Sequence, residues 1–141
     1  MAVVARYLVD TSAAARLQRP TVAQRLVPLI EAGLVATCAP LDYEALTSAR
    51  SPREYEAIRA DRRMAYEYLA TQDEDWQRAL DVHRQLARAS RLREVGLPDL
   101  LIAAAAERHR VMLLHYDDDF DTIGRITEQE VAWVVARGSI P

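Results

Sequence analysis

The chain contains no lysine, and this absence removes several classes of site from consideration. All 18 basic residues among the 141 are arginines. A P-loop needs a lysine directly after its glycines, and the aspartate sites of receiver domains and haloacid-dehalogenase-like enzymes normally need one too. The four glycines are too dispersed for a dinucleotide-binding fingerprint. The arginine preference itself is explained more readily by GC-rich coding than by function.

Cysteine and long apolar runs are also scarce. Cys38 is the only cysteine, which excludes an internal disulfide and a cysteine-based zinc cluster, and we expect it to be a small buried residue. No apolar run approaches the roughly 20 residues that span a bilayer, and the N-terminus lacks the features of a secretory signal. Half of the residues are hydrophobic. We therefore expect one globular domain over residues 1–141, located in the cytoplasm.

The stretch that organises the chain comes near its start. Residues 7–9 are apolar and run directly into Asp10, which is typical of a strand buried on both faces of a parallel sheet. Ser12 precedes three alanines and is predicted to cap the following helix. Asp10 then lies at the carboxyl end of the first strand, where open α/β sheets place their active sites.

Further buried strands are predicted at residues 34–38, 111–115 and 131–135. Helices are predicted between them, over residues 20–33, from Pro40 onwards and from Pro98 onwards, with Pro28 expected to kink or divide the first. Strands that alternate with helices indicate an α/β fold with a central parallel sheet and right-handed crossovers.

Residues 52–93 show a helical pattern with one interruption near residues 71–73. Tyr55 and Leu69 bound the apolar face of the first predicted helix, and Trp76 and Leu86 bound that of the second. We expect the two helices to form a projecting hairpin or cap inserted into the α/β fold. Amphipathic helices usually bury such faces internally, so packing of one helix on the other is the simpler interpretation.

Acidic residues stand at each junction between a predicted buried element and the next helix. Asp10 follows the first strand, Glu44 lies on the helix after the second, Asp99 adjoins Pro98, and Asp117 and Asp119 follow the third. The carboxyl ends of parallel strands lie along one edge of the sheet, so these carboxylates are predicted to converge. Each position taken alone has an ordinary explanation, such as a turn, a helix terminus or a solvated helix face. Their joint occurrence at successive junctions indicates a functional site far more specifically than any one of them does.

Converging carboxylates repel one another, and without a cation at least one should keep its proton well above the usual pH. Mg²⁺ or Mn²⁺ relieves this conflict because hard cations choose oxygen ligands. The three histidines have no metal-binding spacing. The chemistry indicated is hydrolysis of a phosphodiester by a metal-activated water.

Four segments in order along the chain resemble the motifs of PIN-domain ribonucleases, namely residues 9–12, 43–46, 97–103 and 115–123. The last is especially similar to the fourth motif of the VapC toxins. The resemblance implies a single PIN-like domain and an Mg²⁺- or Mn²⁺-dependent endoribonuclease that is toxic when free and inhibited by a VapB antitoxin. It identifies Asp10, Glu44, Asp99 and Asp117 as the acidic quartet.

The same resemblance makes Asp119 an additional metal ligand, direct or through water, and Ser12 or Thr11 the hydroxyl that orients Asp10. Asp118 and Asp121 are not quartet positions and are expected to be solvent-facing or structural. His115 has two interpretations, an RNA contact or a structural role, of which the structural one is the commoner for a histidine that ends a strand.

Residues 50–93 hold ten arginines against eight acidic residues, a net charge of +2 in a chain of net −3. Arg84, Arg88, Arg91 and Arg93 could form a basic collar for an RNA backbone, and Arg50 and Arg53 are alternative phosphate contacts; a solvated helix face is the competing interpretation. The resemblance further implies that the apolar faces of residues 55–69 and 76–86 receive the antitoxin and form a homodimer interface.

Two other functions stay open at this point. The protein could be a binding module that acts through RNA or its antitoxin, with incidental metal chemistry, or a housekeeping PIN nuclease. The complete acidic set argues against a pure binder, because concentrated negative charge repels phosphate. The short chain argues against the housekeeping nuclease.

Overall fold

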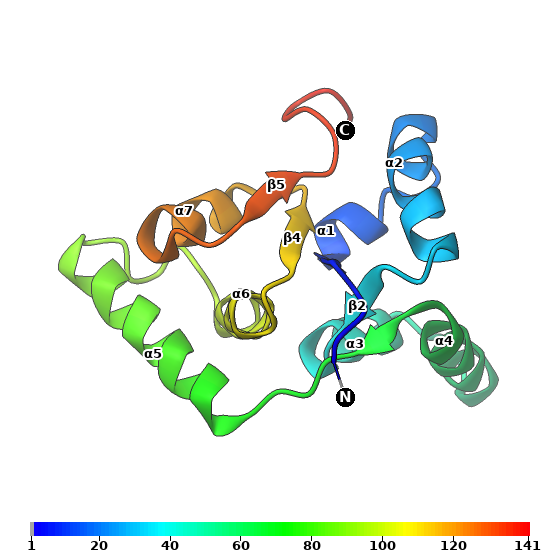
Figure 1. The fold of residues 1–141 in the computed structure, drawn as a ribbon, viewed down its shortest axis with the longest axis horizontal. Helices are drawn as coiled ribbons and strands as arrows, with labels where there is room; N and C mark the ends of the chain where they lie inside the picture. Colours follow the sequence, from blue (N-terminus) through cyan, green and yellow to red (C-terminus); the bar gives the residue numbers. More distant parts are fainter. Residues whose placement is uncertain (1) are drawn as a thin grey trace.

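The structure is a computed structural model that describes residues 2–141, and a five-stranded parallel sheet lies at its centre (Figure 1). The strand order is β3-β2-β1-β4-β5, and every neighbouring pair is parallel. The strands are β1 (Tyr7–Val9), β2 (Val35–Thr37), β3 (Glu67–Tyr68), β4 (Met112–His115) and β5 (Val131–Trp133). The α/β fold with a central parallel sheet is confirmed.

Seven helices connect or flank these strands within the described residues. They are α1 (Thr11–Ala14), α2 (Pro20–Glu31), α3 (Ala39–Thr47), α4 (Pro52–Ala65), α5 (Asp73–Arg88), α6 (Leu97–His109) and α7 (Asp118–Thr127). No helix of residues 2–141 combines the length and the hydrophobicity that a membrane crossing requires.

Each face of the sheet is covered by its own apolar cluster. Leu8 and Leu113 contribute to the cluster formed with α5, α6 and α7, whereas Val9 and Leu114 contribute to the cluster formed with α1 and α2. Successive strand residues point to opposite faces, and all four side chains are buried. Burial on both faces explains why these strands are continuously apolar rather than alternating.

The register aligns the carboxyl ends of the strands. Leu8 of β1 lies between Ala36 of β2 and Leu113 of β4. The residues that follow β1, β2 and β4 therefore emerge at one edge of the sheet, which is where the predicted acidic positions lie.

Two local predictions at the start of the chain were wrong. Asp10, not Ser12, is the N-cap of α1, and its side chain accepts a hydrogen bond from the Ser12 backbone N–H. Pro28 does not divide α2, which is continuous over Pro20–Glu31. Gly33 follows α2 with a φ of +72°, a left-handed conformation that suits glycine at a helix end.

The predicted helical hairpin is not present. The short edge strand β3, which the sequence did not predict, separates α4 from α5, and the two helices lie at different ends of the molecule (Figure 1). Helix α4 packs mainly on α3, and α5 packs on α6. Trp76 and Leu80 are 46% and 56% exposed, because α5 instead turns its Ala79, Val82 and Leu86 side inward. The predicted packing of the two apolar faces on each other was therefore wrong.

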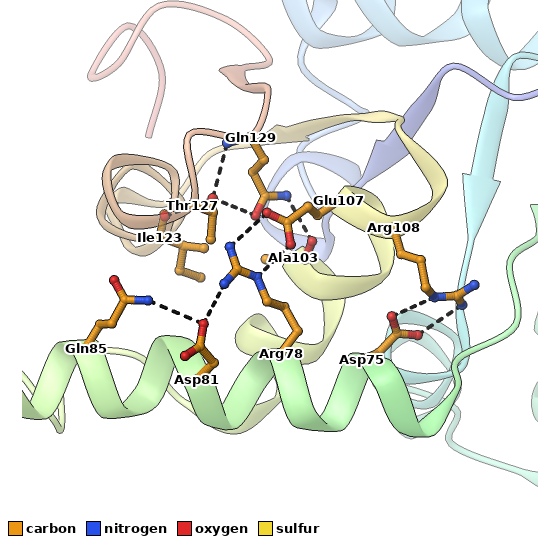
Figure 2. Close-up of polar contacts among 10 residues, drawn as sticks. All are labelled: Asp75, Arg78, Asp81, Gln85, Ala103, Glu107, Arg108, Ile123, Thr127 and Gln129. Atoms are coloured by element: carbon orange, nitrogen blue, oxygen red, sulfur yellow. Dashed lines mark hydrogen bonds and ion pairs between the residues drawn. The ribbon is translucent and has the colours of Figure 1, made fainter.

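Arginine–carboxylate contacts attach α5 to α6 (Figure 2). Arg108 of α6 binds the Asp75 carboxylate through two nitrogens, at 2.8 and 3.1 Å. Arg78 of α5 binds both oxygens of Glu107, at 2.7 and 3.1 Å. Both pairs are bidentate, a geometry that adds orientation as well as strength. They hold α6 in place, and the first turn of α6 carries Asp99.

Candidate metal centre

Asp10 lies at the carboxyl end of β1 and is 4% exposed. Its Oδ2 accepts a hydrogen bond of 2.9 Å from the Ser12 backbone N–H. Its Oδ1 is buried and has no hydrogen-bond partner among residues 2–141. A buried carboxylate oxygen without a donor is costly in free energy, so this atom calls for a cation or another donor.

Asp99, Asp117 and Asp119 form the tightest acidic group. One carboxylate oxygen from each lies within 4.8 Å of the others, the spacing at which three side chains can hold a single metal ion. Asp99 stands in the first turn of α6, after the N-cap Gly96. Asp117 caps α7, and its Oδ1 accepts from the Asp119 backbone N–H at 2.9 Å. Two helix N-termini therefore point their partial positive charge at this group.

Glu44 reaches the same place from α3. Its Oε1 is buried and, like Asp10 Oδ1, has no hydrogen-bond partner in the described part of the chain. Burial raises the pKa of Glu44, the negative charge of Asp10 raises it further, and the hydroxyl of Thr11 opposes both effects. Glu44 and Asp10 thus act on each other electrostatically.

The pKa of Asp99 is raised by burial and by the other four acidic side chains. Burial raises it, and the charges of Asp10, Asp117, Asp119 and Glu44 add to the effect, which brings the pKa to about 7. The pKa of Asp119 is raised by its burial and then by Asp117. The structure thus groups Asp99, Asp117 and Asp119 directly, and it places Asp10 and Glu44 close enough for their charges to act on Asp99.

His115 organises the site without being part of its surface. It is completely buried, packs against Phe120 and Trp133, and its Nδ1 accepts a hydrogen bond of 3.2 Å from the Asp117 backbone N–H. Burial lowers its pKa, which favours the neutral ring that can accept at Nδ1. An RNA contact by His115 is thus excluded, and its role is to position Asp117.

The Ser12 hydroxyl also differs from its expected role. It accepts a hydrogen bond of 2.9 Å from the Tyr116 backbone N–H, while the contact to Asp10 comes from the Ser12 backbone. This bond joins the start of α1 to the end of β4. It thereby fixes the distance between the segments that carry Asp10 and Asp117.

Asp118 and Asp121 lie outside the acidic group, as expected. Asp118 pairs on the surface with Arg137 at 2.7 Å. Asp121 accepts a hydrogen bond of 2.9 Å from the indole of Trp133 and faces His115. Both have local partners, so neither carboxylate is left for a cation.

Glu94 was missed by the sequence analysis. It lies in the loop before α6, and its charge contributes to the raised pKa of Asp119. It pairs at 2.7 Å with Arg91, whose guanidinium also contacts the Thr122 hydroxyl of α7. Of the predicted basic collar, Arg91 thus lies at the rim of the acidic group. Nothing in the local sequence distinguishes Glu94 from an ordinary loop residue.

The donor set fits a hard divalent cation. It consists of carboxylate oxygens only, two of them buried without a donor, and the described residues place no histidine or cysteine among them. Oxygen-only sites suit Mg²⁺, Mn²⁺ or Ca²⁺ better than Zn²⁺, whose protein sites usually include histidine or cysteine.

Comparison with known proteins identifies the family of this chain. The family model of the PIN domain matches residues 7–126. The chain is 46% identical over 134 residues to ribonuclease VapC21 of Mycobacterium tuberculosis, covering 95% of this chain and 97% of that protein. It is 42% identical to ribonuclease VapC51 of the same organism, covering 96% and 97%.

Solved structures share the fold at low sequence identity. VapBC from Salmonella typhimurium bound to DNA has a TM-score of 0.73 at 14% identity, covering 93% of this chain and 99% of the other. VapBC2 from Rickettsia felis, bound to a promoter DNA fragment, has a TM-score of 0.71 at 14% identity, covering 89% and 96%. With the PIN model spanning most of the chain and the VapC ribonucleases matching nearly all of it, this protein belongs to the PIN-domain family and, within it, to the VapC ribonucleases.

Proposed function

We propose that this protein is the toxin of a type II toxin–antitoxin system and acts as an endoribonuclease that hydrolyses RNA phosphodiester bonds. Its relatives VapC21 and VapC51 are ribonucleases, and proteins of the same fold include a toxin–antitoxin complex and a member of the VapBC family of toxin–antitoxin systems. The observation that carries the proposal is the acidic group at one sheet edge, together with buried Asp10 and Glu44 oxygens that have no hydrogen-bond donor among residues 2–141.

The proposed ligands of the catalytic cation are Asp10, Glu44, Asp99 and Asp117, and Asp119 assists directly or through water. Asp99, Asp117 and Asp119 supply oxygens close enough for one ion, while Asp10 and Glu44 supply the two orphan oxygens beside it. We propose Mg²⁺ or Mn²⁺, since both accept carboxylate oxygens. Such a cation, when bound, lowers the pKa of a coordinated water and stabilises the charge that develops on the phosphate.

The chain's own residues prepare this site in three ways. The His115 ring holds the Asp117 backbone, and the Ser12 hydroxyl holds the segment after β4 beside α1. The packing of α5 on α6 holds the helix that carries Asp99. A site whose ligands are fixed in this way needs little reorganisation when the phosphodiester arrives.

The remaining features follow from the same proposal. The 141 residues act as one PIN domain, in the cytoplasm, where RNA is the substrate. A VapB-type antitoxin covers the site in the inactive complex, and two copies of the toxin form a homodimer. The exposed Trp76 and Leu80 of α5 are apolar surface that an antitoxin helix or a second copy could cover.

The test uses purified protein, free of antitoxin, incubated with total cellular RNA and Mg²⁺ or Mn²⁺. We expect discrete cuts that disappear in EDTA and in Asp10→Asn protein, and mapping the new ends identifies the RNA target. Absence of cleavage with either metal, from protein shown to be folded, would reject the nuclease and favour a binding module.

A further inference from the structure

A second feature lies on the other side of α3 from the acidic site. It is a cavity of about 530 Å³ between α3, α4 and the edge strand β3. Figure 1 shows α3 and α4 side by side at this end of the sheet. Its lining residues are Thr37, Asp42, Leu46, Arg59, Arg62, Arg63, Tyr66 and Tyr68. We call it the α3–α4 cavity.

The cavity carries more positive charge than its own carboxylate can neutralise. Arg62 pairs with Asp42 at 2.9 Å and donates to the Thr37 hydroxyl at 2.9 Å, so these two charges cancel. Arg59 and Arg63 also line the cavity, and neither has an ion pair or a side-chain hydrogen bond within residues 2–141. The cavity is therefore left with two unneutralised guanidinium groups in a chain whose net charge is −3.

The spacing of these two arginines places them together. They are four residues apart on α4 and so lie on one helix face, one turn from each other. Like charges at this spacing oppose the helix slightly, and an anion between them removes the repulsion. Arg62 is not available to bind this anion, because it is already paired with Asp42. Its guanidinium carbon also lies 5.0 Å from the centre of the Tyr66 ring.

Aromatic side chains accompany the charges. Tyr66 and Tyr68 line the cavity, and Tyr68 is 58% exposed. Tyr43, on α3, is 74% exposed. Arginines beside exposed aromatic rings are the combination that holds single-stranded nucleic acid, with phosphates on the arginines and bases stacked on the rings.

The register brings this cavity close to the acidic site. Thr37 ends β2 next to β1, and it pairs with Tyr68 of β3. From the end of β1 to Tyr68 is therefore two strand spacings, about 10 Å in all. A single strand of RNA that crosses the acidic site can reach the cavity within a few nucleotides.

Helix α3 provides the path between them. Asp42 faces the cavity and Glu44 faces the acidic site, and these positions are about 200° apart around the helix. Tyr43 lies between them on the solvent side, whereas Leu41 is buried on the opposite side. The strand would thus pass over Tyr43 on its way to Arg59 and Arg63.

We propose that the α3–α4 cavity is a subsite for single-stranded RNA, binding a nucleotide beside the cleaved bond through Arg59, Arg63 and the Tyr68 ring. This inference rests on the proposed ribonuclease function and deepens it. An acidic peptide segment of a protein partner would satisfy the arginines but gains nothing from stacking on Tyr68, so RNA is the occupant that uses the whole site.

The test separates binding from cleavage by measuring both. Binding is followed by fluorescence anisotropy in full-length Asp99→Asn protein, which keeps the cavity intact, with a labelled oligouridine of about 12 nucleotides. In that background, Arg59→Gln/Arg63→Gln is expected to weaken binding about tenfold and to reduce the slope of log K against log salt by about 1.4, the effect of two phosphate contacts. The matched control is Arg110→Gln, an exposed arginine that follows α6 at the opposite edge of the sheet.

Tyr68 gives an independent test of stacking. Tyr68→Ala is expected to weaken binding about tenfold without changing the salt slope, and Tyr68→Phe to restore it. In protein with Asp99 intact, the Arg59→Gln/Arg63→Gln substitutions are expected to raise KM for RNA and to leave kcat within about twofold. Neither arginine touches the scissile phosphate in the proposed complex.

The outcomes are distinct. The subsite proposal would be overturned if the Arg59→Gln/Arg63→Gln variant kept the RNA affinity and salt slope of its parent, or if Arg110→Gln lost as much affinity. It would also be overturned if the double variant lost only antitoxin binding, which would assign the cavity to a protein partner. If the unaltered protein cleaves no RNA but the arginine pair still weakens oligouridine binding, the subsite stands and the nuclease proposal fails.

Discussion

Two aspartates of this protein occupy the same position in two packed helices, but their pKa values are shifted in opposite directions. Asp75 and Asp99 are each the third residue of their helix, α5 and α6. Burial raises the pKa of both. For Asp75 this is outweighed by the hydrogen bonds from Arg108 and the Gln72 backbone, and its pKa is lowered. For Asp99 four further carboxyl groups add to the effect, and its pKa is about 7.

The difference separates a carboxylate with a structural role from one that we propose as a metal ligand. Figure 2 shows that Asp75 has its counter-charge, Arg108, inside the protein. Asp75 also accepts a hydrogen bond from the Gln72 backbone N–H. Within residues 2–141 no arginine or histidine forms an ion pair with Asp99, and the charges that shift its pKa are those of other acids. The helix position is equally favourable to a negative charge in both cases. Only the neighbours decide whether the site is complete without an ion.

The largest effect is expected on catalysis. Asp99→Asn should lower the rate of metal-dependent RNA cleavage by more than about 100-fold, since even outer-sphere partners of metal ligands are worth 10- to 100-fold. The folded protein should be unchanged by circular dichroism. Asp75→Asn is the matched variant, and per folded molecule it should cleave at the normal rate. Normal cleavage by folded Asp99→Asn protein would remove Asp99 from the metal site.

For stability, unlike cleavage, the Asp75 site should matter more than the Asp99 site. Arg108→Ala leaves the Asp75 carboxylate, 1% exposed, without its counter-charge, and should lower the free energy of unfolding by about 3 kcal/mol. Urea denaturation measures this, with Arg110→Ala as the exposed control. A loss below about 1 kcal/mol would show that the Asp75 pair contributes no more than a surface ion pair.

The dependence of stability on pH should separate the two aspartates in metal-free protein. The folded pKa of Asp99, about 7, exceeds its ordinary value of 3.8, so folded protein holds a proton that unfolded protein has lost. Stability should therefore fall as the pH rises from about 4 to about 7. The lowered pKa of Asp75 acts in the opposite sense, and its contribution is lost only as the pH falls below its ordinary value.

Thermal melts in EDTA at several pH values measure this effect. Asp99→Asn should raise the melting temperature by a few degrees at pH 7.5 and by much less at pH 5. Mg²⁺ should raise the melting temperature of the unaltered protein at pH 7.5, because binding to the folded state stabilises it. An equal response to Mg²⁺ in Asp99→Asn protein would argue against this residue as a ligand.

The smallest effect on cleavage and stability is expected for a substitution of Asp118, in the acidic segment of residues 117–119. Asp118 lies between Asp117 and Asp119, but it is exposed and pairs with Arg137, whose side chain is 66% exposed. Asp118→Asn should change stability by no more than about 0.5 kcal/mol and leave cleavage within about twofold. A large loss of cleavage would extend the metal site to a third residue of this segment.

Much of the fold follows from local pattern. Continuous apolar runs predicted β1, β2, β4 and β5, because strands covered on both faces have no polar side. The acidic residues after them were predicted to converge because parallel strands end at one edge. Strand β3 has only two residues and is not a continuous apolar run, so no periodicity could reveal it, and the predicted hairpin of α4 and α5 was wrong for this reason.

By itself the sequence determined the α/β class, and it predicted the sheet edge at which the five acidic residues of the proposed site lie, since both depend on residue type and order along the chain. Only the tertiary structure decided the state of each charge. It paired Asp75 with Arg108 and Asp42 with Arg62, left Asp99 among carboxylates and left Arg59 and Arg63 facing a cavity. The Coulomb interaction depends on distance and burial. The paired residues Asp75 and Arg108 are 33 positions apart in the chain, so the order of residues alone does not reveal the pair.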